Sequence, residues 1–477
     1  MEVRTRIAPS PTGEMHIGHI RTVLYNYALA KHFNGKFIVR VEDTDKARCI
    51  EGCADRTLNV ISEMGFKWDE GPYIQSERLD LYKKYAGELV AKGAAYYCFC
   101  KEERLEELRK EQQEKHFPVT RYDKKCACLG QEEVEQRIKN GEEYVIRLNV
   151  PKDEKISFDD AVYGRITVNS NDIDDQILLK SDGFPSYHLG VVVDDHLMGI
   201  THVMRGNDWL PSTPKHILLY KAFGWEPPIY AHLPNLKEVD GTKKLSKRYG
   251  SVAVLEFLKE GYLPEAMNNF LMFLGWNPGT EKEIYTLPEF IKDFSIEKIQ
   301  KTDLVSFDRQ KLLWFNGIYI RNLKPEELLS RLKTWAKKYE VTLNSSNGEF
   351  DLKVLKLVQE RMKTLSEFNN LIHYFYADLE VDQNLYIEFV DDLKKKDEIL
   401  SAFLKTLEGI EEANWNKEFL DEKGHKVLEE NNYKPKEAFM TLRIAITGEK
   451  ATPQIFDILE VLGRETVLKR LKKQISN

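Results

Sequence analysis

The stretch RIAPSPTGEMHIGHIRTVLYNYALA, residues 6–30, joins a turn rich in proline and glycine to a run of helix-forming residues. Its two prolines disfavour helix in the residues before them, and Gly13 permits a tight turn. Apolar residues at helical spacing follow from about Ile17, and Asn34 with Gly35 marks the end of this helix. The segment KFIVRVEDTD, residues 36–45, then predicts a strand that ends in acidic residues. A strand, a turn, a helix and a strand in this order predict a parallel α/β unit.

The turn before this helix has the properties of a phosphate-binding site. Gly18 has no side chain, so a flat ring or a phosphate can approach its main chain closely. The helix that begins beside it directs free N–H groups and the positive end of its dipole to the same place. His16 and His19 stand three residues apart, on one side of the first turn. We therefore expect a nucleotide here, with two imidazoles that stabilise charge on departing phosphates.

The composition indicates a soluble protein of several domains. Its 477 residues allow about three or four domains, and 42% of them are hydrophobic. No run of about 18 apolar residues occurs, and the first residues lack the apolar core of a secretory signal. We expect a cytoplasmic protein without membrane contact. The net charge of −7 argues against a wholly phosphate-binding surface but permits one basic face for nucleic acid.

The pattern of elements changes twice along the chain. Residues 96–185 interrupt the α/β pattern with a cysteine-rich segment, a charged helical run and two strand-like runs. The α/β pattern resumes at YHLGVVVDDHLMGITHVMRG, residues 187–206. Beyond about residue 320 the spacing of apolar residues is almost entirely helical. A parallel domain with an insertion, followed by an all-helical half, fits this order.

Four of the six cysteines have the spacing of a metal site. Cys98 with Cys100, and Cys126 with Cys128, form two Cys-x-Cys pairs. Four thiolates brought together suit structural zinc, although one-residue spacing is shorter than usual, so free thiols are the alternative. Cysteines without a secretory signal are more often thiols or metal ligands than disulfides. The remaining two, Cys49 and Cys53, have no predicted partner.

Two motifs carry a resemblance to a known family. APSPTGEMHIGH, residues 8–19, resembles the HIGH motif of class I aminoacyl-tRNA synthetases, in the form seen in bacterial-type glutamyl-tRNA synthetases. GTKKLSKRYGS, residues 241–251, is similar to the KMSKS loop of the same family. The similarity continues between them through FIVRVEDTD, EGPYIQSER, LLKSDGFPSYHLGVVVDDHLMGITHV and LLYKAFGW. It extends over essentially the whole chain and is weakest after about residue 380.

The resemblance implies an α/β fold: a Rossmann-type class I synthetase catalytic domain with an α+β insertion, followed by an all-α C-terminal anticodon-binding half. The boundaries that we expect are 1–95 for the first half of the catalytic domain, 96–185 for the acceptor-binding insertion, 186–238 for the second half, 239–320 for a stem-contact domain that contains the KLSKR loop, and 321–380 and 381–477 for two helical anticodon-binding domains.

The same resemblance assigns the nucleotide site. It makes His16, His19, Lys244 and Lys247 catalytic, because histidines and a mobile lysine loop can stabilise charge on departing pyrophosphate. ATP, accompanied by Mg²⁺, is expected at a set that shares three of these residues: Ser10, Gly18, His16, His19, Asp208 and Lys247.

A glutamate substrate carries two carboxylates and one ammonium group, so its site needs fixed charges of both signs. Arg6 and Arg205 are candidates for forked contacts to carboxylate, and Glu42 for the ammonium group. Tyr187 adds a hydroxyl group and an aromatic wall. An arginine at the side-chain carboxylate would reject glutamine, whose amide nitrogen presents donors. Some relatives have asparagine where this chain has Val191, so that polar contact is absent here.

The family also implies zinc at the four paired cysteines, with a role in shaping the acceptor-end domain. Its partner is tRNA(Glu), held by local basic faces, with Lys469, Arg470, Lys472 and Lys473 as candidates. Arg361 matches an arginine that discriminating members use to read the last anticodon base. We therefore expect a monomeric glutamate–tRNA ligase, specific for tRNA(Glu), that needs bound tRNA before it activates glutamate.

Several alternatives remain. The enzyme could also charge tRNA(Gln), or could be a glutaminyl-tRNA synthetase, although that motif is closer to PEPNG-LHIGH. A truncated paralogue that glutamylates a modified tRNA base lacks the helical half. A small-molecule nucleotidylyltransferase shares an H-x-G-H turn but rarely exceeds one domain. A noncatalytic RNA-binding scaffold would not need Arg6, His16, Glu42 and Lys247 together.

Overall fold

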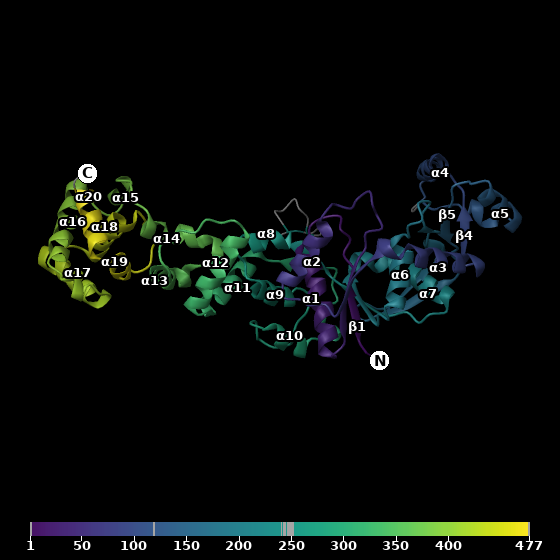
Figure 1. Cartoon of the computed structure of the whole chain (residues 1–477), viewed down its shortest axis with the longest axis horizontal. Coiled ribbons are helices and arrows are strands. Elements are labelled where there is room, and N and C mark those ends of the chain that lie inside the picture. Colours follow the sequence, from purple (N-terminus) through teal and green to yellow (C-terminus); the bar gives the residue numbers. More distant parts are fainter. Residues whose placement is uncertain (1, 118–119, 240, 242–244, 246–251, 476–477) are drawn as a thin grey trace. The chain divides into compact units, whose positions relative to one another are not determined.

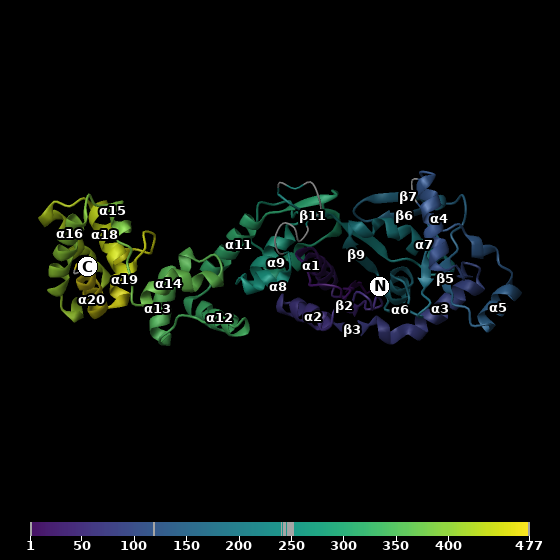
Figure 2. The same ribbon diagram turned by 90° about the horizontal axis from the view of Figure 1, so that it is seen from above.

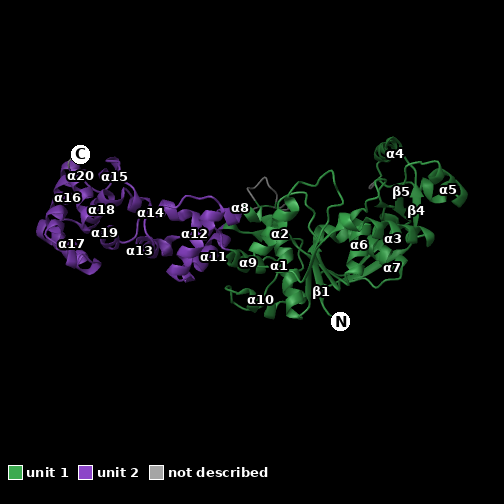
Figure 3. Cartoon of the chain, in the orientation of Figure 1, with its two compact units in different colours: residues 1–256, 264–309 green, residues 257–263, 310–477 purple. Residues whose placement is uncertain are grey.

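The computed structural model describes residues 2–117, 120–239, 241, 245 and 252–475. Lys244 and Lys247 therefore lie outside the described residues. The chain divides into two compact units, with unit 1 formed by residues 1–256 and 264–309 and unit 2 by residues 257–263 and 310–477 (Figure 3). Each unit is described separately below.

Unit 1 contains a parallel sheet built on the first strands of the chain. β1 (Arg4–Ile7), β2 (Lys36–Val41) and β3 (Glu70–Ile74) pair in parallel in the order β1-β2-β3. α1 (Ile17–His32) connects β1 to β2 and is buried on its apolar face. Gly35 lets the chain return to the sheet, because a Cβ atom there would lie 1.9 Å from the Val3 carbonyl oxygen. The predicted strand–turn–helix–strand unit is confirmed.

A second sheet in unit 1 has the order β7-β6-β10-β9. Its strands are β6 (Lys155–Asp160), β7 (Gly164–Asn169), β9 (His202–Gly206) and β10 (Ile229–Leu233). β9, β10 and β6 are parallel, and the Thr201 N–H donates to the Arg4 carbonyl at 2.9 Å, which joins this sheet to β1. Residues 155–169, expected in the insertion, thus extend the sheet that contains β9 and β10.

The remaining strands of unit 1 form two smaller sheets. β4 (Ala95–Cys98), β5 (Val145–Leu148) and β8 (Ile177–Leu179) are antiparallel, while β11 (Asn235–Glu238) and β12 (Leu304–Phe307) are parallel. α4 (Glu102–Glu114) and α5 (Gln131–Lys139) lie near β4 and β5 in Figure 1, and Figure 2 shows the same part of the chain from above. The further helices of this unit are α2 (Cys53–Glu63), α3 (Leu79–Ala91), α6 (Tyr187–Leu197), α7 (Thr213–Phe223), α9 (Pro264–Met272) and α10 (Leu287–Asp293).

Unit 2 is helical throughout the part that the structure describes. α8 (Val254–Lys259) and α11 (Arg309–Asn322) begin in unit 1 and continue into it. Its other helices are α12 (Pro325–Lys338), α13 (Gly348–Val358), α14 (Phe368–Tyr376), α15 (Asn384–Ile387), α16 (Leu393–Glu408), α17 (Lys417–Asn431), α18 (Pro435–Thr447), α19 (Ile455–Leu462) and α20 (Arg464–Ile475). The expected α/β part and all-α C-terminal half are confirmed, while the sixfold division into domains stays a prediction. Among the described residues, no helix is both long and apolar enough to cross a membrane.

Candidate active site at the carboxyl ends of the parallel strands

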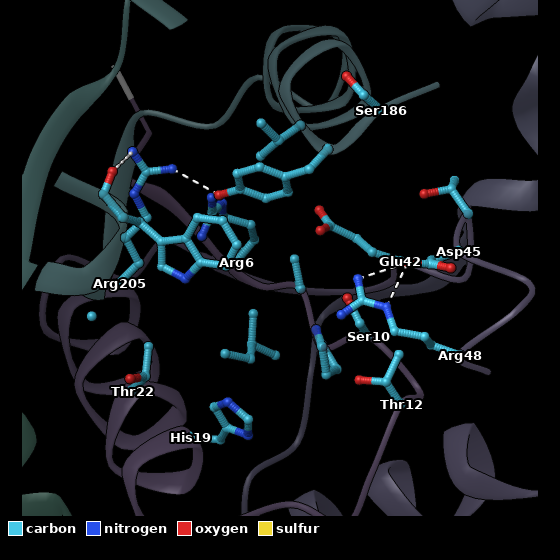
Figure 4. A pocket seen from close by; sticks show the side chains of 18 of the residues that line it. Arg6, Ser10, Thr12, His19, Thr22, Glu42, Asp45, Arg48, Ser186 and Arg205 are labelled. Carbon is cyan, nitrogen blue, oxygen red and sulfur yellow. Dashed lines mark hydrogen bonds and ion pairs between the residues drawn. The ribbon is translucent and has the colours of Figure 1, made fainter. Parts of the chain in front are cut away.

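A cavity of about 630 Å³ opens at the carboxyl ends of β1, β2 and β9. Ligands of open parallel sheets bind at this edge, because several strand ends and helix starts meet there. Figure 4 shows Arg6, Glu42 and Arg205 toward one end of the cavity and His19 toward the other. Further lining residues from the predicted set are Ser10, Tyr187 and Val191. The tertiary fold thus brings together four stretches of sequence, residues 6–22, 42–48, 180–191 and 204–209.

The start of α1 is organised by its own histidines. His16 caps the helix, because its Nδ1 accepts the Gly18 N–H at 3.0 Å. A Cβ atom on Gly18 would lie 2.9 Å from His16 Cε1, so any side chain here would displace the His16 ring from its capping position. The rings of His16 and His19 stack, with their centroids 3.6 Å apart. The sequence predicted two imidazoles on one side of the helix start, and they lie together there.

The residues on both sides of segment 246–251 are anchored beside this helix start. The Ile17 N–H donates to the Val252 carbonyl at 2.9 Å, and the Val254 N–H donates to the Met15 carbonyl at 2.9 Å. Upstream, the Leu245 N–H donates to the carbonyl of Leu236 in β11 at 2.6 Å. Downstream of the segment, Val252 and Val254 are therefore joined to the start of α1, and upstream of it Leu245 is joined to β11.

Arg6 and Glu42 are held by a buried network that the sequence analysis did not identify. Arg40, fully buried in β2, donates to a Glu42 oxygen at 2.9 Å and to an Asp195 oxygen at 2.9 Å. Asp195 in turn accepts two hydrogen bonds from Arg6 at 3.2 Å. A charged residue inside the apolar strand FIVRV, and the pair Asp194–Asp195 after VVV, are the sequence signals that could have revealed it.

Burial and pairing oppose each other in this network. Burial raises the pKa of Glu42, although the guanidinium groups of Arg40 and Arg6 counteract it. Burial acts in the same direction on Asp195, but Arg6 and Arg40 together hold its pKa below the usual value. Of the two carboxylates, Glu42 is the one that lines the cavity.

Arg205 is held by a different kind of partner. Its guanidinium donates to the Tyr187 hydroxyl at 2.9 Å, to the Thr213 hydroxyl at 2.9 Å and to His232 Nε2 at 3.1 Å. His216 Nδ1 lies 3.4 Å away. Tyr187 was predicted in the same amino-acid pocket as Arg205, whereas Thr213, His216 and His232 carried no motif and were missed.

Asp208 occupies a different position from the other predicted ATP-binding residues. Its carboxylate is exposed and accepts a hydrogen bond from Asn235 at 2.6 Å, and it does not line the cavity. His16 and Gly18 likewise lie at the helix start without lining the cavity itself. Conversely, Thr44, Arg48 and Lys180 line the cavity and were not predicted.

Three of the four predicted metal ligands form one group. The sulfur atoms of Cys98, Cys100 and Cys126 lie within 4.8 Å of one another, whereas Cys128 is exposed and is not in the group. The Tyr122 hydroxyl contacts the sulfurs of Cys98 at 3.4 Å and Cys100 at 3.3 Å. Hydrogen bonds from Cys126 and Tyr122 lower the pKa of Cys98 despite its burial. Soft thiolate donors at this spacing suit a zinc ion.

The basic residues predicted to face tRNA make contacts within unit 2. Arg361 donates to the Thr452 carbonyl at 3.0 Å, and Arg470 donates to the carbonyls of Tyr374 at 2.6 Å and Ile446 at 2.7 Å. Lys472 pairs with Glu408 at 2.7 Å. Arg470 therefore ties helices together, while Lys469 remains largely exposed, with its ammonium 3.6 Å from Asp378.

A parallel α/β domain with charged side chains at its strand ends, a histidine-capped helix start and a following helical unit define a class I nucleotide-dependent synthetase architecture. The chain belongs to the family of class I tRNA synthetases for glutamate and glutamine (E and Q). The catalytic-domain model of that family matches residues 2–314, and an anticodon binding domain model matches residues 327–475. The resemblance drawn from the sequence motifs is confirmed.

Individual relatives are similar over their full length. A glutamate–tRNA ligase of Finegoldia magna is 42% identical, with 100% of this chain and 99% of the relative covered. One of Dehalococcoides mccartyi is 43% identical, with 100% and 98% covered. The crystal structure of a glutamate tRNA ligase from Elizabethkingia meningosepticum in complex with its amino acid matches with a TM-score of 0.90, at 32% identity, and covers 100% of both chains.

Proposed function

We propose that this chain is a glutamate–tRNA ligase, which activates L-glutamate with ATP and transfers it to the 3′ end of tRNA(Glu). The observation that carries this proposal is the set of charges around one cavity: the guanidinium groups of Arg6 and Arg205 and the carboxylate of Glu42. Two cations and one anion complement the two carboxylates and one ammonium group of glutamate. The curated relatives with this name, similar over the whole chain, support the same substrate.

In the first step a glutamate α-carboxylate oxygen attacks the α-phosphorus of ATP, and the bond from that phosphorus to the pyrophosphate oxygen breaks. A ribose hydroxyl of the tRNA then attacks the acyl carbon, and AMP leaves. The protein forms no covalent intermediate with the substrates in this scheme. Its contribution is therefore to position the reacting groups and to stabilise the charge that develops on them. The start of α1, with His16, His19 and the Gly18 main chain, would receive the phosphates. Mg²⁺ would accompany ATP and neutralise phosphate charge.

Lys244 and Lys247 complete the proposed nucleotide site. They lie outside the described residues and are proposed from the similarity of GTKKLSKRYGS to the lysine loop of the family. Closure of such a loop would add positive charge as pyrophosphate departs. Ser10 and Asp208 are proposed for ATP binding as the family pattern suggests.

Glu42 is the proposed acceptor for the ammonium group. Arg40 holds this carboxylate in place at 2.9 Å and leaves it facing the cavity. Tyr187, bonded to Arg205, would form the wall beside the amino-acid side chain. Val191 also lines the cavity, so an apolar contact stands where some relatives have asparagine.

Zinc is proposed at Cys98, Cys100 and Cys126, with Cys128 as the fourth ligand predicted from sequence. Its role would be structural, because these residues lie in the insertion, at the end of β4, two residues beyond it, and on the short 3₁₀ helix Lys125–Cys128. We also propose that Arg361 reads the last anticodon base, that the enzyme is specific for tRNA(Glu), and that it acts as a cytoplasmic monomer.

Charging of purified tRNA(Glu) and tRNA(Gln) with glutamate and with glutamine, side by side, tests this function. We expect glutamate on tRNA(Glu) only. Glutamate on both tRNAs would show a non-discriminating enzyme, and glutamine on tRNA(Gln) would overturn the substrate assignment. Pyrophosphate exchange with and without tRNA shows whether glutamate activation needs the tRNA.

A further inference from the structure

The buried charged groups near the cavity include three guanidinium groups and three carboxylates that pair with one another. Arg205 supplies a further guanidinium group. Arg6, Arg40 and Arg78 contact three carboxylates, those of Glu42, Asp194 and Asp195, with every pair at 3.6 Å or less. Three guanidinium groups therefore face three carboxylates. Arg205 belongs to no such pair: among the residues that the structure describes, no carboxylate oxygen lies within 4.0 Å of its nitrogen atoms.

Arg205 is nevertheless deeply buried, with 6% of its surface exposed, and all of its hydrogen-bond partners are neutral acceptors. They are hydroxyls, a carbonyl and imidazole nitrogens, namely Tyr187, Thr213, the Trp209 carbonyl, His232 and His216. A guanidinium group has only donors, so each of these atoms must present a lone pair. Such partners satisfy the N–H groups but do not cancel the charge.

This requirement determines the protonation of both histidines. His232 accepts from Arg205 at Nε2, so its proton is on Nδ1, where it donates to Asp160 at 2.6 Å. His216 presents Nδ1 to Arg205, so its proton is on Nε2, 3.1 Å from His188 Nδ1. Burial, together with the Arg205 charge, lowers the pKa of both rings, which keeps them neutral.

The carboxylate of Asp160 is not an ion-pair partner of Arg205. It lies on the Nδ1 side of His232, away from Arg205, and is satisfied by the N–H groups of Val162 at 3.0 Å and Tyr163 at 2.9 Å. Arg205 meets it only through the neutral ring. The two histidines thus form an imidazole cradle, His216 and His232, behind the cavity wall.

We propose that the imidazole cradle determines specificity: it holds Arg205 in position without neutralising it, so that this guanidinium pairs with a carboxylate of the amino-acid substrate. The inference rests on the proposed function and extends it to residues that touch no substrate. His216 and His232 are therefore positioning residues. A carboxylate in the cradle would serve as an internal counter-ion and remove the preference for an acidic side chain over its amide.

His216 offers a matched pair of substitutions that differ in charge. His216→Asn keeps a neutral oxygen acceptor near the position of Nδ1, and His216→Asp places a carboxylate there, which Arg205 would keep ionised. We expect the KM for glutamate of His216→Asp to exceed that of His216→Asn by at least about tenfold, the factor that corresponds to 1.4 kcal/mol. The KM for ATP should agree within about twofold, since neither change reaches the phosphate end.

The measurement is charging of tRNA(Glu) by the full chain at varied glutamate, with glutamine as the competing substrate. The Asp variant should also lose at least about tenfold in its preference for glutamate over glutamine. Equal KM values for glutamate in the two variants would overturn the inference. If the wild-type chain itself fails to charge tRNA(Glu), the proposed function fails instead, so the two failures are distinguishable.

A second pair of substitutions at His216 is available if a member of the first pair does not fold. His216→Gln and His216→Glu differ in charge in the same way and reach further, toward the site of Nε2. Circular dichroism melting selects the pair whose members both fold. A merely structural role of His216 would lower stability or kcat in both members alike, whereas the proposed role separates their KM values for glutamate and leaves their KM values for ATP together.

Discussion

His188, on α6, makes the stability of unit 1 depend on pH. Burial, with Lys215 and Arg205 nearby, lowers the pKa of His188 to about 3. In the unfolded chain a histidine titrates near 6.5, so below that pH the unfolded state binds a proton that the folded state refuses. The contribution of the neutral His188 ring to the stability of the folded state is therefore fully present above about pH 6.5, and it declines as the pH falls toward about 3.

The size of this effect follows from the two pKa values. Each pH unit between them lowers the free energy of unfolding by about 1.4 kcal/mol, so the loss from this one ring reaches about 2 kcal/mol at pH 5. His188→Asn removes the titrating group. We expect the variant to lose about 2 kcal/mol less than the wild type between pH 8 and pH 5.

Amide hydrogen exchange of peptides from α6 and α7, expressed as protection factors, reports the unfolding free energy of this region alone. His116→Asn is the matched control, since His116 is exposed and its left-handed φ of 54° suits asparagine. The free energy of unfolding of this control should fall with decreasing pH as that of the wild type does. The reasoning is refuted if the free energy of unfolding of His188→Asn falls as steeply with decreasing pH as that of the wild type. It is also refuted if the control variant shows the same weakened pH dependence as His188→Asn.

Four further outcomes are expected. Arg40→Met leaves Glu42 and Asp195 buried without their shared cation, so we expect thermal or urea unfolding to show a loss of about 3–5 kcal/mol, and a loss below about 1 kcal/mol would contradict the network. Metal analysis should find about one zinc per chain, and Cys98→Ser should remove it, whereas a metal-free, fully folded wild type would defeat the zinc proposal. Cys128→Ser decides the fourth ligand, because retained zinc would favour the Tyr122 hydroxyl in its place. Lys247→Ala should lower adenylate formation by orders of magnitude with tRNA affinity nearly unchanged, and equal losses in both would indicate a structural lysine.

Local patterns in the sequence determined the elements and much of the site. Proline, glycine and histidine before an apolar helical run specify the turn and cap at the start of α1, because capping and backbone freedom act over a few residues. Helical periodicity after residue 320 specified the all-α half for the same reason. Arg6, Glu42, Tyr187 and Arg205 could be proposed from motifs, and each lines the same cavity.

Only the tertiary structure decided which charges compensate one another. Arg6 and Asp195 lie 189 residues apart, and Arg205 and His232 lie 27 residues apart on neighbouring parallel strands. No local propensity encodes such pairs, because they arise when strands and helices from different segments are packed and polar groups must find partners away from water. The sequence alone identifies four candidate cysteines, but the path of the chain leaves Cys128 exposed and places Tyr122 against the other sulfurs.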